Sequence, residues 1–164
     1  MAGARAYLER AQAIQEASMG PDHVEVARTR ESLARVLRDQ GELAGARANL
    51  EGAQTILQAN LGPEHPWLGR TLDYLGLVLR AQGDLNRARA TLERAQTILQ
   101  NGLGAEHPWL GHVLGSLGRV LHDQGDLDGA RASLERALAI FEAVDGDHHW
   151  VGGVLYSLSL VLID

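Results

Sequence analysis

Apolar residues recur along the chain with the spacing of one face of an α-helix. In four stretches an alanine, a leucine and a second alanine stand at positions i, i+4 and i+7, which share one helical face. These sets are Ala4, Leu8 and Ala11; Ala46, Leu50 and Ala53; Ala88, Leu92 and Ala95; and Ala130, Leu134 and Ala137. The pattern predicts four helices with one buried stripe each, which we call the B helices.

A second helix with its own apolar stripe is predicted between successive B helices, and we call these the A helices. Their stripes read Leu33, Val36 and Leu37; Leu75, Val78 and Leu79; and Leu117, Val120 and Leu121. The small residues Ala34, Gly76 and Gly118 stand beside these leucines. Glycine inside a helix costs about 1 kcal/mol relative to alanine. We therefore expect these positions to be points where two helix backbones approach closely.

Glycines and acidic residues mark the helix boundaries. We expect A helices over 24–40, 66–82, 108–124 and 149–164, the first three ending at the Gln-Gly steps before residues 42, 84 and 126. Glu42, Asp84 and Asp126 then stand where an acidic side chain can cap a B helix. The B helices end before Gly20, Gly62, Gly104 and Gly146. The expected order is B-A-B-A-B-A-B-A.

The same phrase returns after 42 residues. Gly-x-Glu-His-Pro-Trp-Leu-Gly occupies 62–69 and again 104–111. A fixed period of this length is typical of a solenoid, in which each unit packs only against its neighbours. The sequence predicts one array over 1–164, with a B helix at 1–19, units at 20–61, 62–103 and 104–145, and a final A helix at 146–164.

Composition excludes several kinds of chemistry. All fifteen basic residues are arginine and the chain has no cysteine, so lysine nucleophiles, P-loop lysines, thiol nucleophiles and Cys-type zinc sites are excluded. The net charge of −6 disfavours nucleic-acid binding. The most apolar run, 154–163, is shorter than the roughly 20 residues that cross a bilayer, and 1–19 is no secretory signal. We expect a cytoplasmic protein with no membrane contact.

The helix pair resembles the tetratricopeptide repeat. The resemblance rests on small residues at Ala34 and Ala46, leucines at 33, 37 and 50, Gly41 at the turn and Ala53 on the second helix. The period of 42 and the Gly-Pro-Asp-His and Gly-Pro-Glu-His-Pro loops are similar to the kinesin-light-chain-like variety. This resemblance covers essentially the whole chain. It implies an all-α, right-handed superhelix of eight antiparallel helices whose A helices line a concave, peptide-binding groove.

The expected ligand-contacting residues of this groove are arginines rather than asparagines. The family often carries an asparagine pair on helix A, but those places hold Glu31-Ser32, Asp73-Tyr74, Gly115-Ser116 and Tyr156-Ser157. If the family geometry holds, the groove is lined by Arg28, Arg35, Arg38, Arg70, Arg80, His112, Arg119 and His122. A guanidinium group binds both oxygens of a carboxylate. The sequence thus predicts a scaffold that binds a protein or peptide segment, and the arginines favour an acidic one.

Two alternatives to a ligand-binding groove remain open at this stage. The arginines can be a solvated surface partly neutralised by Glu31, Asp39, Asp73 and Asp123. Alternatively, the array is a structural segment that stacks head-to-tail, because its first B helix and last A helix lack a partner helix. Such association would use Leu8, Ile14, Leu155, Tyr156, Leu158, Leu160 and Leu162.

Histidine and tryptophan also recur once per unit. His23, His65, His107 and His148 precede the A helices, but helices pack about 8 to 10 Å apart, too far to share one metal ion. We expect structural histidines and no metal site, although His148 and His149 stand beside Asp145 and Asp147. Trp67, Trp109 and Trp150 are expected to pack between repeats rather than serve as exposed anchors. With no catalytic motif, we expect neither an enzyme nor a cofactor.

Overall fold

The computed structural model describes residues 2–144 and 148–163, and these form helices joined by short loops. The B helices are α1 (Ala2–Met19), α3 (Leu43–Leu61), α5 (Leu85–Leu103) and α7 (Leu127–Ala143). The A helices are α2 (Val24–Asp39), α4 (Pro66–Ala81), α6 (Pro108–Asp123) and α8 (His148–Ile163). The predicted all-α class and the alternating order of helices are confirmed, with eight helices and no strand in the described ranges.

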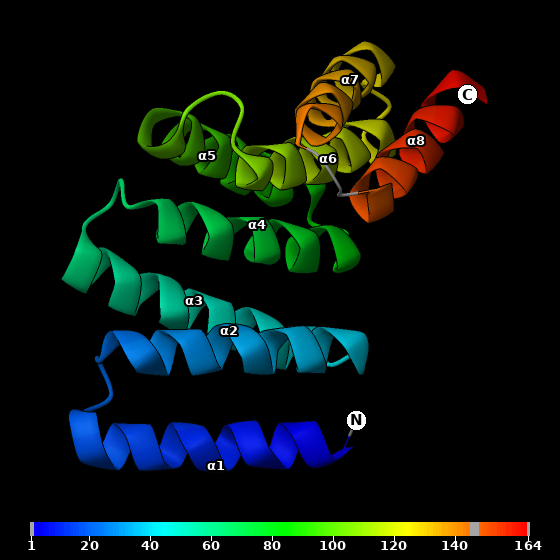
Figure 1. Cartoon of the computed structure of the whole chain (residues 1–164). Helices are drawn as coiled ribbons and strands as arrows, with labels where there is room; N and C mark the ends of the chain where they lie inside the picture. The colour runs from blue at the N-terminus through cyan, green and yellow to red at the C-terminus, as the bar shows by residue number, and fades with distance from the viewer. Residues whose placement is uncertain (1, 145–147, 164) are drawn as a thin grey trace.

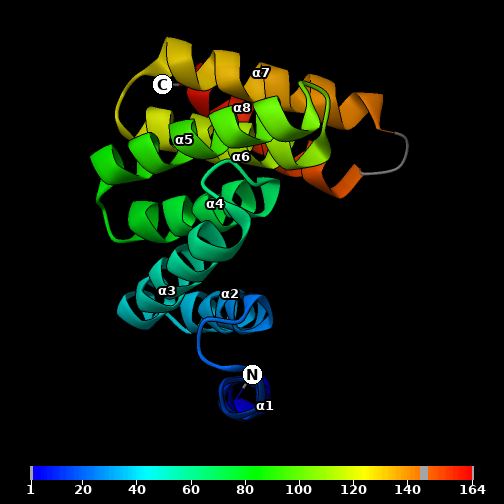
Figure 2. The ribbon, with the colours of Figure 1, turned by 90° about the vertical axis from the view of Figure 1, so that its left-hand side faces the viewer.

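The helices stack in chain order (Figure 1). α1 lies at one end of the stack, α7 and α8 lie at the other, and the two termini are correspondingly far apart. Each A helix packs on the B helix before it and, where one follows, on the B helix after it, while successive A helices also touch one another. Figure 2 shows the same stack turned by 90°, with the direction of the helices changing between its lower and upper layers. The array is thus extended in one direction, as repeat packing requires.

The loop histidines begin the A helices. Nδ1 of His23, His65 and His107 accepts a hydrogen bond from the backbone N–H two residues later, at 3.2, 3.2 and 3.1 Å. They are therefore helix caps, although the side chain of His148 lies outside the described residues. Asp84 and Asp126 cap α5 and α7 as expected. Glu42 makes no such cap and instead accepts a hydrogen bond from Arg5 of α1 at 2.6 Å.

The core forms where a B helix leucine meets a glycine of the preceding A helix. A Cβ atom added to Gly76 would lie 2.6 Å from Cγ of Leu92, and one added to Gly118 would lie 2.6 Å from Cγ of Leu134. Both leucines are completely buried. Full burial of a leucine side chain contributes about 1.5 to 3 kcal/mol. The missing glycine side chains therefore bring the two helices close enough to bury these leucines.

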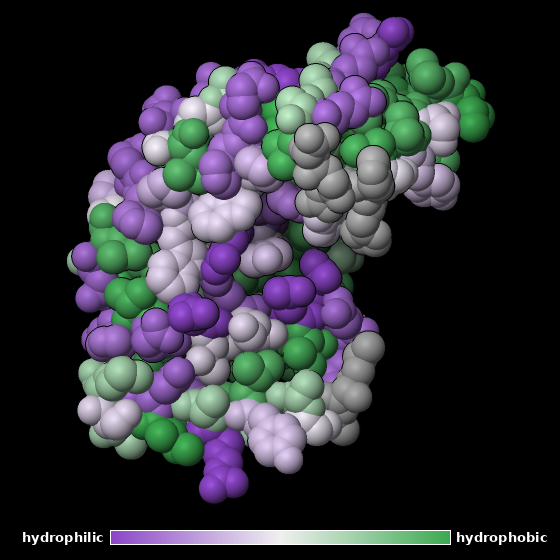
Figure 3. All heavy atoms as spheres, in the orientation of Figure 1, coloured by the Kyte–Doolittle hydropathy of each residue, from purple (hydrophilic) through white to green (hydrophobic). Residues whose placement is uncertain are grey.

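The two end helices expose the residues that the interior helices bury. Ile14 of α1 is 58% exposed, whereas Ile56 and Ile98 at the equivalent places are almost fully buried. On α8, Leu162 is 67% exposed while its equivalent on α6, Leu121, is 4% exposed. Each end helix lacks, among the described residues, the neighbour that covers this face elsewhere. Space-filling shows an apolar surface over α8 (Figure 3).

Because equivalent leucines differ in burial, their truncation should have unequal effects on stability. Leu92→Ala should lower the free energy of unfolding by about 2 to 5 kcal/mol, since it leaves a cavity in a packed layer. Leu8→Ala, at the matching place on α1, should cost about 1 kcal/mol because this leucine is only half-buried. Urea denaturation followed by circular dichroism measures both. Equal losses would contradict a layered array with weakly packed ends.

Candidate functional site

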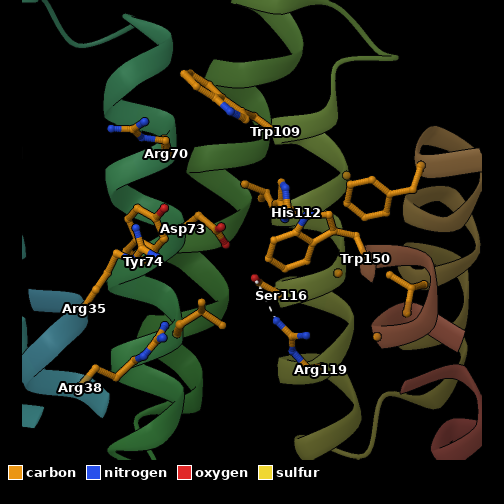
Figure 4. A pocket seen from close by; sticks show the side chains of 17 residues that line it. Arg35, Arg38, Arg70, Asp73, Tyr74, Trp109, His112, Ser116, Arg119 and Trp150 are labelled. Atoms are coloured by element: carbon orange, nitrogen blue, oxygen red, sulfur yellow. Dashed lines mark hydrogen bonds between the residues drawn. The ribbon is translucent and has the colours of Figure 1, made fainter. Parts of the chain in front are cut away.

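The A helices line a hollow that contains two adjoining cavities. The first cavity, of about 510 Å³, lies between α4, α6 and α8 and is walled by Tyr74, Trp109 and Trp150. The second cavity, also about 510 Å³, continues toward the C-terminal ends of the A helices, past Leu77 and Val161. We call the two together the groove. Its first cavity is drawn in Figure 4.

The structure places most of the predicted groove residues on these walls. Five of them line the first cavity, namely Arg35, Arg38, Arg70, His112 and Arg119. The second cavity is lined by Arg38, Arg80, Arg119 and His122. Arg28 lines neither cavity: it is exposed on α2 and pairs with Glu25 at 3.5 Å. The first repeat therefore contributes its arginines only from the later turns of α2.

Arg70 is committed to a buried network. Its Nη2 donates to Oε2 of Glu31 at 2.7 Å, and Nε1 of Trp67 donates to the same carboxylate at 3.1 Å. The hydroxyl of Thr71 donates to the other oxygen. Glu31 is 4% exposed, and the guanidinium also lies over the ring of Trp109. This network connects the first two repeats, so the main role of Arg70 is to stabilise the fold rather than to bind a ligand.

The remaining arginines differ in how far they are neutralised. Arg80 pairs with Asp123 at 2.6 Å and Arg38 pairs with Asp39 at 2.9 Å, both in partly exposed positions where such pairs are weak. Arg35 instead lies over the ring of Tyr74, 5.7 Å from its centroid. Nη2 of Arg119 donates to Oγ of Ser116 at 3.4 Å (Figure 4).

Arg35 and Arg119 therefore face the first cavity with no carboxylate paired to them in the described part of the chain. Burial lowers the pKa of Arg119, with the neighbouring positive charge of Arg80 as a smaller cause. Both effects disfavour a charge held without a counter-ion. The charges of Asp73 and Asp123 partly offset both effects. An anion entering this cavity would add to them.

Asp73 is a site residue that sequence reasoning treated only as a neutralising charge. It is 7% exposed, lines the first cavity, and its Oδ1 has no hydrogen-bond partner. Burial raises the pKa of this carboxyl to about 6, opposed by a hydrogen bond with Ser116 and by the charges of Arg119 and Arg38. Figure 4 shows it pointing from α4 into the space beside α6.

The sequence did contain a signal for this role. Asp73 stands 42 residues after Glu31, so the two carboxylates occupy the same place in successive repeats. Arg70 and Thr71 donate hydrogen bonds to Glu31. One repeat later, the positions equivalent to these two donors hold a histidine and a valine. Two of the three donors that complete the first carboxylate are thus replaced in the second layer, where Trp109 stands in the place of Trp67.

The tryptophans contact neighbouring repeats, and both Trp109 and Trp150 also wall the first cavity. Trp67 and Trp109 are half-buried, whereas Trp150 is 44% exposed. The ring of His112 meets Trp150 edge-on at 4.1 Å and Phe141 at 5.1 Å. These contacts join α6, α7 and α8 at one end of the first cavity.

The residues expected to mediate self-association lie on different faces. Leu155 and Leu162 are exposed on the face of α8 that corresponds to the α7-covered face of α6. Leu158 is half-buried against the core. Tyr156 and Leu160 instead line the second cavity, because they match Gly115 and Arg119 in the repeat. Of the α1 residues, Ile14 is exposed while Leu8 packs against the core.

Residues 2–144 and 148–163 contain neither a cluster of metal-binding side chains nor a membrane-spanning helix. No group of three or more histidine, aspartate or glutamate residues there is arranged to hold a metal ion. The side chains of Asp145, Asp147, His148 and His149 lie outside the described residues. None of the described helices combines the length and apolarity needed to cross a bilayer.

Comparison with known proteins identifies the repeat. A tetratricopeptide repeat family model matches residues 1–51, 31–101 and 74–143. The chain belongs to this family. No curated protein matches the chain at a significant level.

Solved structures place this tetratricopeptide repeat protein among kinesin-light-chain-like arrays. BtubC (BKLC) from P. vanneervenii has a TM-score of 0.83 at 19% identity; the match covers 95% of this chain and 63% of BtubC, so this chain spans less than two thirds of that protein. A putative kinesin light chain from Podosopora anserina with nearly identical TPR-like repeats has a TM-score of 0.75 at 25% identity, over 96% of this chain and 75% of that one. A variant of the same Podosopora anserina protein has a TM-score of 0.77 at 25% identity, over 96% of this chain and 74% of that one.

The network around Glu31 predicts a large penalty for removing its arginine. Arg70→Ala should lower the free energy of unfolding by about 2 to 4 kcal/mol, because it leaves a buried carboxylate without its ion pair. Arg28→Ala, at the equivalent place one repeat earlier, should change it by less than about 0.5 kcal/mol because that pair is exposed. Thermal or urea denaturation compares the two. If adding Glu31→Gln to Arg70→Ala restored no stability, the lost partner would not be the cause.

Proposed function

We propose that this tetratricopeptide repeat protein is an interaction module whose groove binds an acidic segment of a protein partner. The observation that carries this proposal is the pair of guanidinium groups, Arg35 and Arg119, that face the first cavity without a paired carboxylate. Guanidinium groups favour carboxylate ligands because their planar fork matches both oxygens. The acidic segment would supply the close ion pairs that Arg35 and Arg119 do not form with the described carboxylates.

The cavity walls add apolar contact to this charge. Tyr74, Trp109 and Trp150 present ring surface beside the arginines. Aromatic side chains and arginine are the residue types most enriched where binding energy is concentrated. The whole chain carries a net charge of −6, so attraction for an acidic segment is confined to the groove. These features favour an acidic segment with at least one apolar side chain.

A peptide titration tests the acidic-ligand proposal. The wild-type protein should bind an acidic peptide more tightly than a basic peptide of equal length, and more weakly at high salt. Arg35→Ala with Arg119→Ala should weaken binding about tenfold or more, since each removes a charge-assisted contact worth about 1.5 to 3 kcal/mol. Arg94→Ala, an exposed arginine on α5 outside the groove, is the matched control.

Two outcomes would reject this function for the groove. Equal affinity for acidic and basic peptides would remove the charge argument. Equal loss of affinity in the Arg94 variant and in the groove variant would show that binding follows overall charge rather than the cavity. Circular dichroism of each variant confirms that the fold is retained before affinities are compared.

A second candidate function is head-to-tail assembly, favoured by the open face of α8. This face comprises Gly152, Leu155, Ser159 and Leu162, which match the α6 residues that α7 covers. A Cβ atom on Gly111 would lie 2.9 Å from Phe141 of α7, whereas one on Gly152 meets nothing within 4 Å. The space that α7 fills on α6 is therefore open on α8.

Helix α1 of a second copy fits this space. Its Ala4, Leu8 and Ala11 repeat the Ala130, Leu134 and Ala137 stripe with which α7 packs. Each leucine that becomes buried contributes at most about 1.5 to 3 kcal/mol before the costs of association. The contact is heterologous, so it builds open chains unless the rotation closes a ring.

Light scattering against concentration tests the assembly. The mass of the wild-type protein should rise with concentration, and Leu155→Glu should suppress the rise because it places a charge on the open face. Gln100→Glu introduces the same charge at an exposed residue of α5, away from both end helices, and it should leave the rise intact. A wild-type protein that stays monomeric at every concentration would exclude the assembly.

A further inference from the structure

The second layer of the groove contains a buried carboxylate that lacks a full set of hydrogen-bond partners among the described residues. Glu31, in the first layer, accepts hydrogen bonds from Trp67, Arg70 and Thr71. Asp73 occupies the same place one repeat later and lines the first cavity, yet its buried Oδ1 has no hydrogen-bond partner among the described residues. Buried polar groups are otherwise almost always paired. The unpaired oxygen indicates that a ligand completes this layer.

The charges around Asp73 decide what kind of ligand group fits. Four guanidinium groups line the same cavity, from Arg35, Arg38, Arg70 and Arg119. A lysine or arginine of a ligand would meet these positive charges, so a cation is disfavoured even though Asp73 is acidic. A ligand carboxylate would be attracted by these arginines, but it would lie beside the carboxylate of Asp73. Two such groups at hydrogen-bond distance cannot both be ionised, and they retain one proton between them.

We propose that the first cavity is the subsite for a ligand carboxyl group, which Arg119 and Arg38 hold by charge while Asp73 and the ligand share one proton in a hydrogen bond. This inference rests on the proposed function, because it names the atoms that meet the acidic segment. The shared proton gives Oδ1 of Asp73 the partner it lacks. Ser116 lies between Asp73 and Arg119 in this arrangement and orients both (Figure 4).

A shared proton makes binding depend on pH in a defined direction. Burial already raises the pKa of Asp73 to about 6 in the free protein. A ligand carboxylate adds a like charge and raises that pKa further, so the complex holds more protons than the free protein above this pH. Affinity should therefore be constant below about pH 6 and fall above it, by at most about tenfold per pH unit for one proton.

Other titratable groups lie near Asp73, and they determine which control variants the pH experiment needs. The charged or titratable residues on the packed elements are Arg35 and Arg38 of α2, Arg70, Tyr74 and Arg80 of α4, His112, Arg119 and His122 of α6, and Tyr156 of α8. The arginines keep their charge throughout the relevant range. Histidine is the residue type that ordinarily changes charge near this range, and a cationic side chain would also strengthen anion binding. Variants of His112 and His122 must therefore be measured beside that of Asp73.

The experiment is a titration with a terminally blocked hexaglutamate peptide, from about pH 5.5 to 8.5 at constant ionic strength, where the glutamates of the free peptide are ionised. Asp73→Asn, which is isosteric and permanently uncharged, should bind tightly at every pH and lose the dependence. His112→Gln and His122→Gln should each keep it. In parallel, the carbon-13 shift of the Asp73 carboxyl should report a pKa that rises by about one unit or more with saturating peptide.

Each possible outcome decides the matter. Peptide binding with no pH dependence, or dependence that survives Asp73→Asn, would overturn the shared proton while leaving the acidic-ligand function in place. If the pH dependence of affinity disappears in either histidine variant, the proton belongs to that histidine and not to Asp73. No peptide binding at any pH would overturn the proposed function as well. The Asp73 carboxyl titration keeps the test valid even if a variant fails to fold.

Discussion

The close contact between a B helix leucine and a glycine of the preceding A helix is the constraint on which the rest of the array depends. Leu92 against Gly76 and Leu134 against Gly118 leave no room for a side chain on the A helix. Because these contacts hold one face of α4 and one face of α6 in the core, the opposite face of each helix is turned to the groove. The residues of that face recur at a fixed interval along the chain. Equivalent residues of successive repeats therefore stand next to one another along the groove.

The layers are alike in the core and different in the groove. Equivalent groove positions hold Glu31, Asp73, Gly115 and Tyr156, while the leucines behind them hardly change. In the first layer the carboxylate is completed by Arg70 and holds two repeats together. In the second, Oδ1 of Asp73 has no hydrogen-bond partner among the described residues, and Arg35 and Arg119 beside it form no ion pair there. Interaction specificity in this protein is therefore expected to come from differences between layers rather than from the repeated core.

Much of the fold could be predicted because it depends on local contacts. The helix boundaries follow from loop histidines, acidic caps and glycine turns close in sequence, and positions 42 apart play equal roles. The pairing of the groove arginines could not be predicted in this way. Arg70 with Glu31 and Arg80 with Asp123 join residues on different helices, and the distance between them depends on how the layers stack. Arg28 lies outside the groove because the cavities open only between later helices, which the periodicity does not reveal.

The central claim is that the A helix face around Arg119 is where a partner binds, and NMR mapping with an acidic peptide tests it most directly. The account predicts the largest shift changes at the side-chain N–H groups of Arg35 and Arg119 and at the indole N–H groups of Trp109 and Trp150. The corresponding signals of arginines on α5 and α7 should stay in place. Changes confined to the B helices, or spread evenly over all arginines, would contradict the account.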